Sequence, residues 1–197
     1  MSYGLARRDT HQRMSYDAPL DVARQAASAA MPDDLRAALS AHHASAWAWA
    51  LTCCRGDRHS AHDVLHDVYV NILAGRAAFA GRSAFKTWLF GCIRLTAMAT
   101  RRRRLLLDIL YEPIGPLAET IAAPSAAPGA SPALMAALAA LPRRQSEIVA
   151  LVFGHDLSLE EAAAIMGVSV GSARQHHTRA KRKLHAALTP EQETDYG

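Results

Sequence analysis

The sequence predicts an all-α protein, organised as two small helical domains with a helix-turn-helix near its C-terminus. Apolar residues recur at helical spacing along most of the chain, whereas β-branched runs with strand-like alternation are absent. Hydrophobic residues make up 50% of the sequence, and much of this content is alanine, which favours close packing of helices over a large sheet core. Residues 112–133 contain five prolines and seven alanines but no lysine or arginine, a composition typical of a linker between domains.

The length of the chain fits two small domains, and its charge fits an anionic partner. Its 197 residues suffice for two small domains, and its formal net charge of +4 arises from cations gathered in two stretches. No apolar run approaches the roughly 20 residues that a membrane-spanning helix needs, and the N-terminus lacks the apolar core of a signal peptide. We therefore expect a cytoplasmic protein without direct membrane insertion.

We expect five consecutive segments, with Pro32 as a natural first boundary. They are an N-terminal extension of no assignable role (1–33), a first helical domain (34–111), the linker (112–133), a second helical domain (134–188) and a tail (189–197).

The first domain is expected to begin with a helix from Asp33 to about Thr52, then a break at Gly56 and a second helix capped by Ser60. The apolar residues expected to enter its core are Leu35, Leu39, Trp47 and Leu51, followed by Val64, Leu65, Val68, Tyr69, Ile72 and Leu73. The other face of the second helix carries Asp63, His66, Asp67 and Asn71. Such a face is either solvated or a docking surface for a protein, and spacing alone does not decide between them.

Residues 75–83 contain glycines and arginines and predict a loop. The segment after the loop begins with Phe85, Trp88 and Phe90 and ends in four arginines, 101–104. Aromatic rings can stack on the bases of single-stranded nucleic acid while cations hold its backbone. Taken singly, the aromatic residues are more typical of a helical core, whereas four consecutive arginines favour contact with nucleic acid.

The second domain ends in the strongest signal of the sequence, a helix-turn-helix over 158–184 with a cationic second helix. Ser158 and Glu161 have the spacing of a capping box, Gly167 can end the first helix, and Ser169 can cap the second. A short helix over 134–141 and a helix that begins at Pro142 are expected to support it. The apolar stripe of the latter consists of Ile148, Val149, Leu151 and Val152.

The cationic helix has a buried stripe and an outer face. At about 100° per residue, the stripe consists of Ala173, His177, Ala180 and Leu184. Early residues of a recognition helix reach base edges, while later cations usually meet phosphates. The predicted base contacts are Arg174, Gln175, Thr178 and Arg179, with His176 a weaker candidate, and the predicted phosphate contacts are Arg182 and Lys183.

Three cysteines (Cys53, Cys54 and Cys92) do not predict a disulfide framework. A metal- or redox-sensing site is one hypothesis, because His42, His43, His59 and His62 are near the first two in sequence. Adjacent cysteines suit one tetrahedral zinc ion poorly, so we expect the thiols to pack as small hydrophobic groups and no cofactor to be bound.

Three stretches together resemble the extracytoplasmic-function (ECF) group of bacterial sigma factors in the sigma-70 superfamily. They are HDVLHDVYVNIL (62–73), GRSAFKTWLFGCIRLTAMATRRRR (81–104) and LPRRQSEIVALVFGHDLSLEEAAAIMGVSVGSARQHHTRAKRKL (141–184). They cover about half of the chain, in the order and spacing of the family. The resemblance implies that the first domain is sigma region 2, which binds core RNA polymerase and melts the −10 promoter element. The second domain is then region 4, which reads the −35 element.

The resemblance also implies roles for single residues. Residues 62–73 would grip the clamp helices of the polymerase β′ subunit through Asp63, His66, Asp67 and Asn71, and the first helices of region 4 would meet the β flap. The −10 contacts would be Arg82, Ser83, Phe85, Lys86, Trp88, Arg94, Arg101, Arg102, Arg103 and Arg104. The −35 contacts would be Ser172, Arg174, Gln175, His176, Thr178, Arg179, Arg182 and Lys183. In this family an anti-sigma factor commonly masks both domains, and the linker runs toward the RNA exit path.

The chain departs from the family pattern at several positions. Leu95 stands where an Asn usually follows the arginine, and Ala99 stands in place of a common Asp. His66 replaces a usual Gln, His176 stands where Arg is common, and His177 stands where an aliphatic residue usually packs. These departures bear on the −10 readout and the promoter sequence more than on polymerase binding.

We therefore expect a dissociable initiation subunit that performs no chemistry itself. The sequence has no nucleotide-binding glycine loop and no convincing nucleophile–base set. The alternative is a stand-alone helix-turn-helix regulator that binds duplex DNA as a dimer at paired half-sites.

Overall fold

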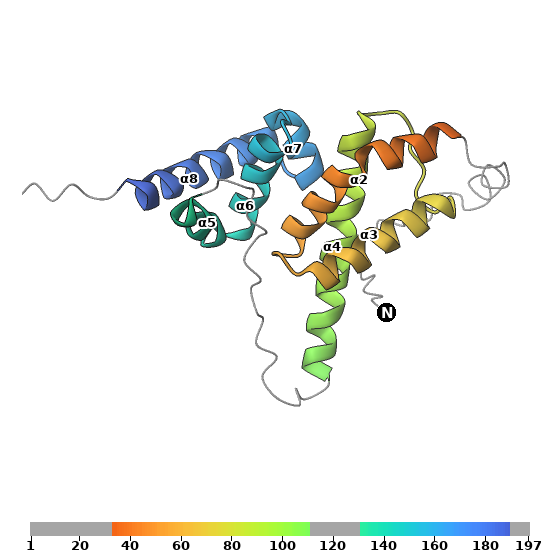
Figure 1. Ribbon diagram of the computed structural model, residues 1–197, viewed down its shortest axis with the longest axis horizontal. Coiled ribbons are helices and arrows are strands. Elements are labelled where there is room, and N and C mark those ends of the chain that lie inside the picture. The colour runs from red at the N-terminus through yellow and green to blue at the C-terminus, as the bar shows by residue number, and fades with distance from the viewer. Residues whose placement is uncertain (1–32, 111–130, 190–197) are drawn as a thin grey trace, which may run out of the picture.

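Two helical bundles lie side by side in the computed structural model, which describes residues 33–110 and 131–189 (Figure 1). Across these two ranges every regular element is a helix, as the sequence predicts. None of the described helices is both long and apolar enough to cross a membrane. Most of the predicted N-terminal extension, linker and tail fall outside the described residues.

The first bundle packs α2 (Asp33–Cys53), α3 (Arg58–Leu73) and α4 (Phe85–Leu110) against one another. At its centre lies Trp49, which is fully buried and stacks on Phe90 with ring centroids 5.7 Å apart. The indole Nε1 also donates a hydrogen bond to the Phe90 carbonyl at 3.0 Å, so α2 is joined to α4 by both packing and a satisfied polar group. The second half of α4 extends past the other helices (Figure 1).

Most predicted core residues of this bundle are confirmed. Those that are buried or partly buried against the core are Leu35, Leu39, Trp47, Leu51, Val64, Leu65, Val68, Tyr69 and Ile72. Leu73 is an exception, because it is the last residue of α3 and is 50% exposed. The predicted Ser60 cap is also wrong. Asp57 caps α3, because its Oδ1 accepts from the amides of both His59 and Ser60 at the start of the helix, and its Oδ2 accepts from the Ser60 hydroxyl.

The second bundle contains α5 (Pro132–Ala139), α6 (Arg143–Val149), the π-helical turn η1 (Ala150–Gly154), α7 (Leu159–Met166) and α8 (Val170–Leu188). The first of these begins two residues before its predicted start, because Pro132 occupies the first helical turn, where its missing N–H is not needed. The helix after Pro142 continues directly into η1, and the stripe residues Ile148, Val149 and Leu151 are buried.

The caps of the helix-turn-helix are confirmed. Ser158 accepts from the Glu161 amide at 3.1 Å while the Glu161 carboxylate accepts from the Ser158 amide at 2.9 Å. Gly167 ends α7 with φ of 62°, a left-handed conformation that a side chain would strain. Ser169 then caps α8 by accepting from the Ser172 amide. These local bonds set the angle at which α8 leaves the turn.

The predicted stripe of α8 is buried at Ala173 and Ala180. Leu184 is half-buried against the core, and His177 is only half-buried. The His177 ring stacks on Phe153 of η1 with centroids 5.5 Å apart, so an aromatic contact replaces the aliphatic packing that is usual at this position. Burial is the main cause that lowers the pKa of His177, and its Nε2 has no hydrogen-bond partner.

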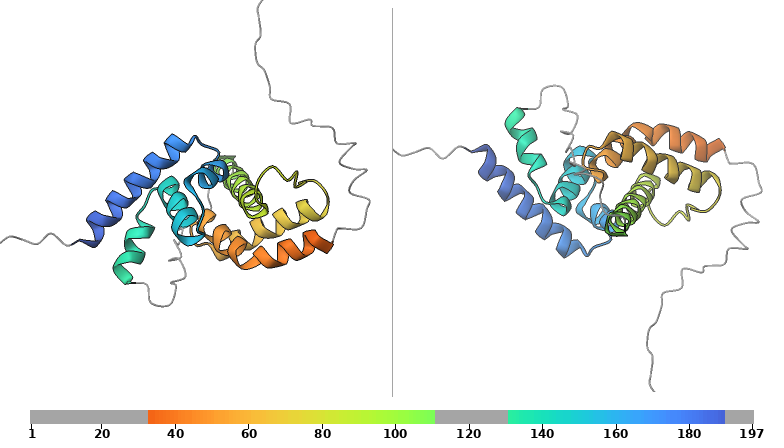
Figure 2. Two further views of the ribbon diagram at one scale, coloured as in Figure 1. Left: turned by 90° about the horizontal axis from the view of Figure 1, so that it is seen from above. Right: turned by 90° about the horizontal axis from the view of Figure 1, so that it is seen from below.

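The two bundles are in contact with each other. Helix α4 packs along α7, and α2 touches α6 and η1. Both views in Figure 2 show α7 beside α4, with α8 on the far side of the second bundle. The outer face of α8 is therefore turned away from the first bundle, whereas α4 lies at the junction.

Candidate nucleic-acid interface

The outer face of α8 is the more accessible of the two predicted DNA-binding surfaces. Its exposed residues are Arg174, Gln175, Thr178, Arg179, Arg182 and Lys183. They stand opposite the buried alanines of the stripe, because the α7–α8 turn presents one side of the helix to solvent. Four cations on one exposed helix face make a surface suited to the phosphates and base edges of a major groove.

Arg174 and Ser172 already have partners within the second bundle. The Arg174 guanidinium lies 3.4 Å from a carboxylate oxygen of Glu160, on the first turn of α7, and both side chains are well exposed. Ser172 lies 3.0 Å, hydroxyl to hydroxyl, from Ser169, and it belongs to the cap of α8. An exposed ion pair of this kind is weak and is readily exchanged for a phosphate or a base.

His176 is half-buried on the same helix. Burial, together with the positive charges of Arg144 and Arg179, lowers the pKa of His176 below its usual range. Its imidazole is thus neutral at neutral pH, and it can both donate and accept a hydrogen bond. A neutral ring is suited to a base edge rather than to a phosphate.

An aromatic cluster stands at the start of α4. Phe85 and Trp88 have ring centroids 5.4 Å apart, and Phe79 of the preceding loop lies 5.3 Å from each of them. The Phe79 side chain is 39% exposed, so the cluster is open to solvent at the loop. Phe79 lies within the predicted loop, and the sequence predicts no role for its side chain. In the same loop, Arg82 and Ser83 are exposed.

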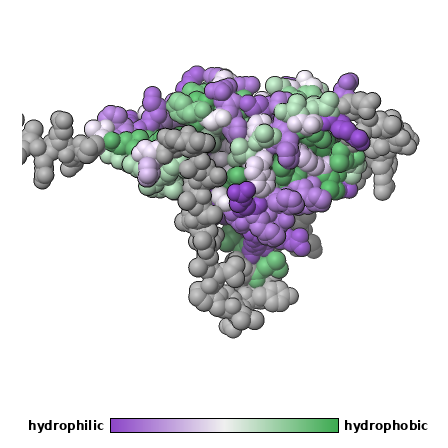
Figure 3. Space-filling view, in the orientation of Figure 1, coloured by the Kyte–Doolittle hydropathy of each residue, from purple (hydrophilic) through white to green (hydrophobic). Residues whose placement is uncertain are grey.

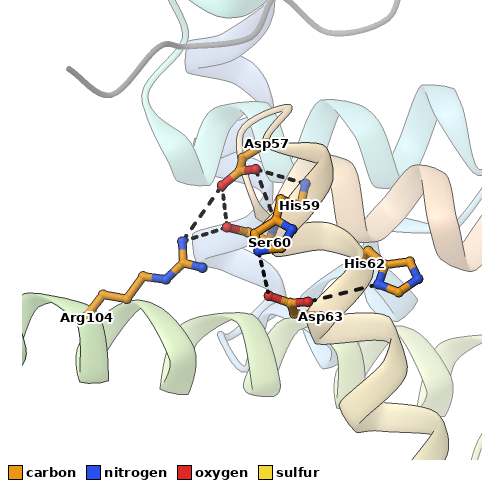
Figure 4. Close-up of polar contacts among 6 residues, drawn as sticks. All are labelled: Asp57, His59, Ser60, His62, Asp63 and Arg104. Atoms are coloured by element: carbon orange, nitrogen blue, oxygen red, sulfur yellow. Dashed lines mark hydrogen bonds and ion pairs between the residues drawn. The ribbon is translucent and has the colours of Figure 1, made fainter. Parts of the chain in front are cut away.

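The four arginines at 101–104 lie in the second half of α4, and all four are exposed. Arg104 is held at the start of α3, where its guanidinium donates to the Ser60 hydroxyl at 2.6 Å and lies 3.8 Å from Asp57 (Figure 4). In Figure 3, hydrophilic side chains gather where α3 begins beside α4, and hydrophobic ones appear below them. The exposed Leu105, Leu106 and Leu107 follow directly in sequence.

Two other predicted −10 contacts of α4 are bound by the second bundle instead of facing solvent. Arg94 is only 6% exposed, and its Nε donates to Glu147 of α6 at 3.0 Å. Lys86 Nζ donates to the main-chain carbonyl of His155 at 2.6 Å. In this arrangement the junction between the bundles therefore buries Arg94 and engages the ammonium group of the half-buried Lys86.

Comparisons with known proteins place both bundles in one family. The sequence profile described as "Sigma-70 region 2" matches residues 38–105, and that described as "Sigma-70, region 4" matches residues 131–184. The chain is 31% identical over 170 residues to the ECF RNA polymerase sigma factor EcfG of Rhodopseudomonas palustris strain TIE-1, with 85% of this chain and 92% of the relative covered. The protein belongs to the ECF sigma factors.

Two solved structures have the same fold. One is the sigma factor RpoE in complex with the anti-sigma factor NepR from Bartonella quintana, with a TM-score of 0.65, 23% identity, and 80% of this chain and 98% of that chain covered. The other is CnrH in complex with the cytosolic domain of CnrY, with a TM-score of 0.53, 26% identity, and coverage of 85% and 95%. We therefore use the names region 2 for α2–α4 and region 4 for α5–α8.

The polar face of region 2 lies on α3. His66 and Asp67 are exposed, and Asp63 is half-exposed, 3.6 Å from the His59 ring and 4.0 Å from the His62 ring (Figure 4). Asn71 accepts from Arg76 Nε at 2.7 Å, which ties the end of α3 to the following loop. None of these four residues is among the buried residues of the described core, so the face is accessible to another protein.

The cysteines of region 2 have the environment of packed thiols. Burial raises the pKa of Cys53 well above its ordinary value and that of Cys54 to about 11, and it also raises the pKa of Cys92. Protonated thiols are poor metal ligands and poor nucleophiles at neutral pH. Within 33–110 and 131–189, no three His, Cys, Asp or Glu side chains are grouped so as to hold a metal ion.

Proposed function

We propose that this sigma factor binds core RNA polymerase and directs initiation by gripping the promoter at two points. Region 4 reads the −35 element through the outer face of α8, while region 2 captures and opens the −10 element through the aromatic cluster and the arginines of α4. The observation that carries the proposal is the presence, in one chain, of both a region 2 and a region 4 match, each with its own cationic surface.

The two surfaces suit different forms of DNA. On α8, an exposed helix face with Arg174, Gln175 and Arg179 matches the width and hydrogen-bonding pattern of a major groove. On region 2, the rings of Phe79, Phe85 and Trp88 lie close to one another at the start of α4, and the same helix carries exposed arginines at 101–104 in its second half, a combination suited to unpaired bases and their backbone. Duplex reading and strand capture are therefore divided between the two bundles. This division supports residues 34–111 and 134–188 as the functional units.

The polymerase contacts follow from the resemblance to the family. We assign the polar face of α3, formed by Asp63, His66, Asp67 and Asn71, to the β′ clamp helices, and the first helices of region 4 to the β flap. The exposed and half-exposed acidic groups on this face support the assignment, because a rigid helix presents them without cost to the core. The polymerase, which works in the cytoplasm, performs the chemistry, and the sigma factor contributes binding and strand separation.

An anti-sigma factor is the expected regulator. RpoE from Bartonella quintana has the same fold and was solved in complex with the anti-sigma factor NepR. A partner that covers both bundles of this chain would prevent polymerase binding and promoter binding together.

Run-off transcription with purified core polymerase tests the function. Transcription starts mapped after induction of the protein in its host supply the cognate promoter, and the assay compares core alone with core plus the full chain. We expect specific transcripts only when the chain is added. Transcript levels equal to those of core alone would refute the proposal.

A second assay tests the polymerase contact. Reversal of Asp63 and Asp67 to Lys changes the charge of the α3 face without touching the core, so we expect weaker binding to core polymerase and an unchanged circular dichroism spectrum. Unaltered affinity would show that this face is only solvated.

A further inference from the structure

A buried ion cluster joins region 2 to region 4. The Glu147 carboxylate accepts from Arg94 Nε at 3.0 Å through one oxygen and from Arg143 Nε at 2.9 Å through the other. Glu147 is 1% exposed and Arg94 is 6% exposed, so both charges are removed from water. Arg94 belongs to α4, whereas Glu147 and Arg143 belong to α6. Arg143 also donates to the Cys53 carbonyl at the end of α2.

A second contact across the same junction involves Lys86. Its ammonium group donates to the His155 carbonyl at 2.6 Å, immediately after η1. The His155 ring packs edge-on against both Trp49 and Phe90, with centroids 6.1 and 4.8 Å away. The segment after η1 thus packs on the core of region 2, and its His155 carbonyl accepts a hydrogen bond from Lys86 of α4.

These contacts engage the groups that a promoter would need. Arg94 and Lys86 are two of the −10 contacts that the resemblance to the family implies, and each donates to an acceptor of region 4 in this arrangement. The Arg94 guanidinium is nearly inaccessible, so it cannot bond to a phosphate or a base while Glu147 holds it. The closed arrangement and −10 binding through Arg94 therefore exclude each other.

We propose that region 4 autoinhibits the free sigma factor: Glu147 and the His155 carbonyl hold Arg94 and Lys86 in a closed state that opens before −10 DNA is bound. This inference rests on the proposed function of α4. The opening separates the two bundles, exposes the start of α4, and frees region 4 to reach a promoter element at a distance from the first.

The energetics of a buried ion pair suit such a switch. Desolvation offsets much of the attraction between Arg94 and Glu147, and both charges regain water when the bundles separate. The intact pair therefore fixes how α4 and α6 align in the closed state, but it adds little to the free energy needed to separate the two bundles. Removal of one partner destabilises the closed state relative to the open state, because the other charge is then buried and unpaired in the closed state alone. A partner that binds only the open state, such as core polymerase, then shifts the population by its differential affinity.

Small-angle X-ray scattering of the full-length chain tests the inference. The variants are Glu147→Gln, which keeps the side-chain shape but removes the charge, and Glu160→Gln, a matched control that removes a carboxylate from an exposed ion pair away from the junction. We expect a compact wild-type protein, a compact Glu160→Gln protein, and an increase of about tenfold or more in the ratio of open to closed molecules for Glu147→Gln.

Lys86→Met provides a second route to the open state, because it removes the donor to His155 without leaving a buried charge. Circular dichroism of each variant shows whether the helices remain intact. If Glu147→Gln lowers the helical content, Lys86→Met decides, with a smaller increase in the open fraction expected. Helical variants that both stay as compact as the wild type would overturn the proposal.

Failure of this inference is distinguishable from failure of the proposed function. A wild-type chain that supports run-off transcription, with Glu147→Gln still compact, would remove the closed-state switch and leave the function. A Glu147→Gln chain that opens, with no run-off by the wild type, would leave the switch and remove the function.

Discussion

The cations of α8 and those of α4 are held in different ways. On α8, all the predicted arginine and lysine contacts are exposed, and within the described part of the chain only Arg174 has an anionic partner, the exposed Glu160. On α4, Lys86 and Arg94 bond to region 4, Arg104 bonds to the start of α3, and only Arg101, Arg102 and Arg103 are exposed without a hydrogen bond or ion pair among the described residues.

If the two surfaces have their proposed roles, this difference makes the two promoter elements unequally available to the free protein. The α8 surface is preformed, because capping bonds and alanine packing set its orientation within region 4 alone. In the closed state proposed above, Lys86 and Arg94 of α4 become available only when region 4 moves away. On this proposal, duplex reading needs no rearrangement, whereas strand capture does.

The largest expected effect concerns the aromatic residue that joins α2 to α4 in region 2. Trp49→Ala removes a fully buried ring and its hydrogen bond to α4, and we expect it to lower the free energy of unfolding by about 3–5 kcal/mol. The control is Trp47→Ala on the same helix, whose ring is only partly buried. Denaturant unfolding measures both, and equal losses would show that Trp49 has no special role in holding α4.

The next effect concerns His155 of region 4, whose ring packs on the core of region 2. Burial, and secondarily the charge of Lys86, lowers the pKa of His155 from 6.5 to about 4, while Asp156 opposes this shift. The unfolded chain thus binds a proton before the folded chain does as the pH falls. Stability contributed by neutral His155 is complete above about pH 6.5 and is lost as the pH falls toward about 4, by up to about 3 kcal/mol.

Unfolding measured in denaturant at several pH values between 7 and 4 tests this expectation, with His155→Gln as the comparison. His176 and His177 also have lowered pKa values, so the wild type minus the variant isolates His155. Parallel curves for the two proteins would contradict the assignment.

A smaller effect concerns the free surface of α8. Arg174→Ala or Arg179→Ala is expected to cost about 1–3 kcal/mol of discrimination between −35 variants, because each side chain can bond to a base edge. Lys183→Ala, the matched control, should weaken binding to all variants alike, as loss of a phosphate contact does. Competition binding of the holoenzyme to a panel of −35 sequences measures both. An unchanged preference for Arg174→Ala and Arg179→Ala would refute base reading.

The smallest effect distinguishes the arginines of α4 from one another. The slope of log binding constant against log salt concentration reports how many phosphates the holoenzyme contacts. If Arg101, Arg102 or Arg103 contacts a single-stranded phosphate, its change to Ala should lower the magnitude of this slope by about 0.7. Arg104→Ala should change this slope less, because its guanidinium is bonded to Ser60 and lies near Asp57. Titrations in salt compare the four single variants, and identical slopes would show that the Arg104 contacts do not restrict it.

The parts of the structure that the sequence predicted best depend on local bonds. Each cap of the helix-turn-helix connects residues that are within three or four positions of one another, so the sequence pattern predicts it. These caps are the capping box at Ser158, the left-handed Gly167 and the Ser169 cap. The same holds for the apolar stripes of α2 and α3. Even a local signal fails where two groups compete, as the nearby Asp57 and Ser60 show at the start of α3.

The contacts that hold the proposed closed state could not be predicted from the sequence. Arg94 and Glu147 are 53 positions apart, and Lys86 and His155 are 69 apart, so no periodicity relates them. The hydrogen-bond acceptor of Lys86 is a main-chain carbonyl, and because every residue has one, the sequence does not mark it. Trp49 and Trp47 have the same chemistry, and only the packing of α4 decides which is buried. Phe79 lies in a loop, where helical spacing carries no information.

The most direct test of this account compares binding of the free protein to its two promoter elements. The probes are a −35 duplex and a −10 non-template single strand, both taken from the cognate promoter, and the proteins are the wild type and Glu147→Gln. We predict that the variant binds the −10 strand about tenfold more tightly or better, while its affinity for the −35 duplex is unchanged. Equal affinity of the two proteins for the −10 strand, or an equal gain on both probes, would contradict the account.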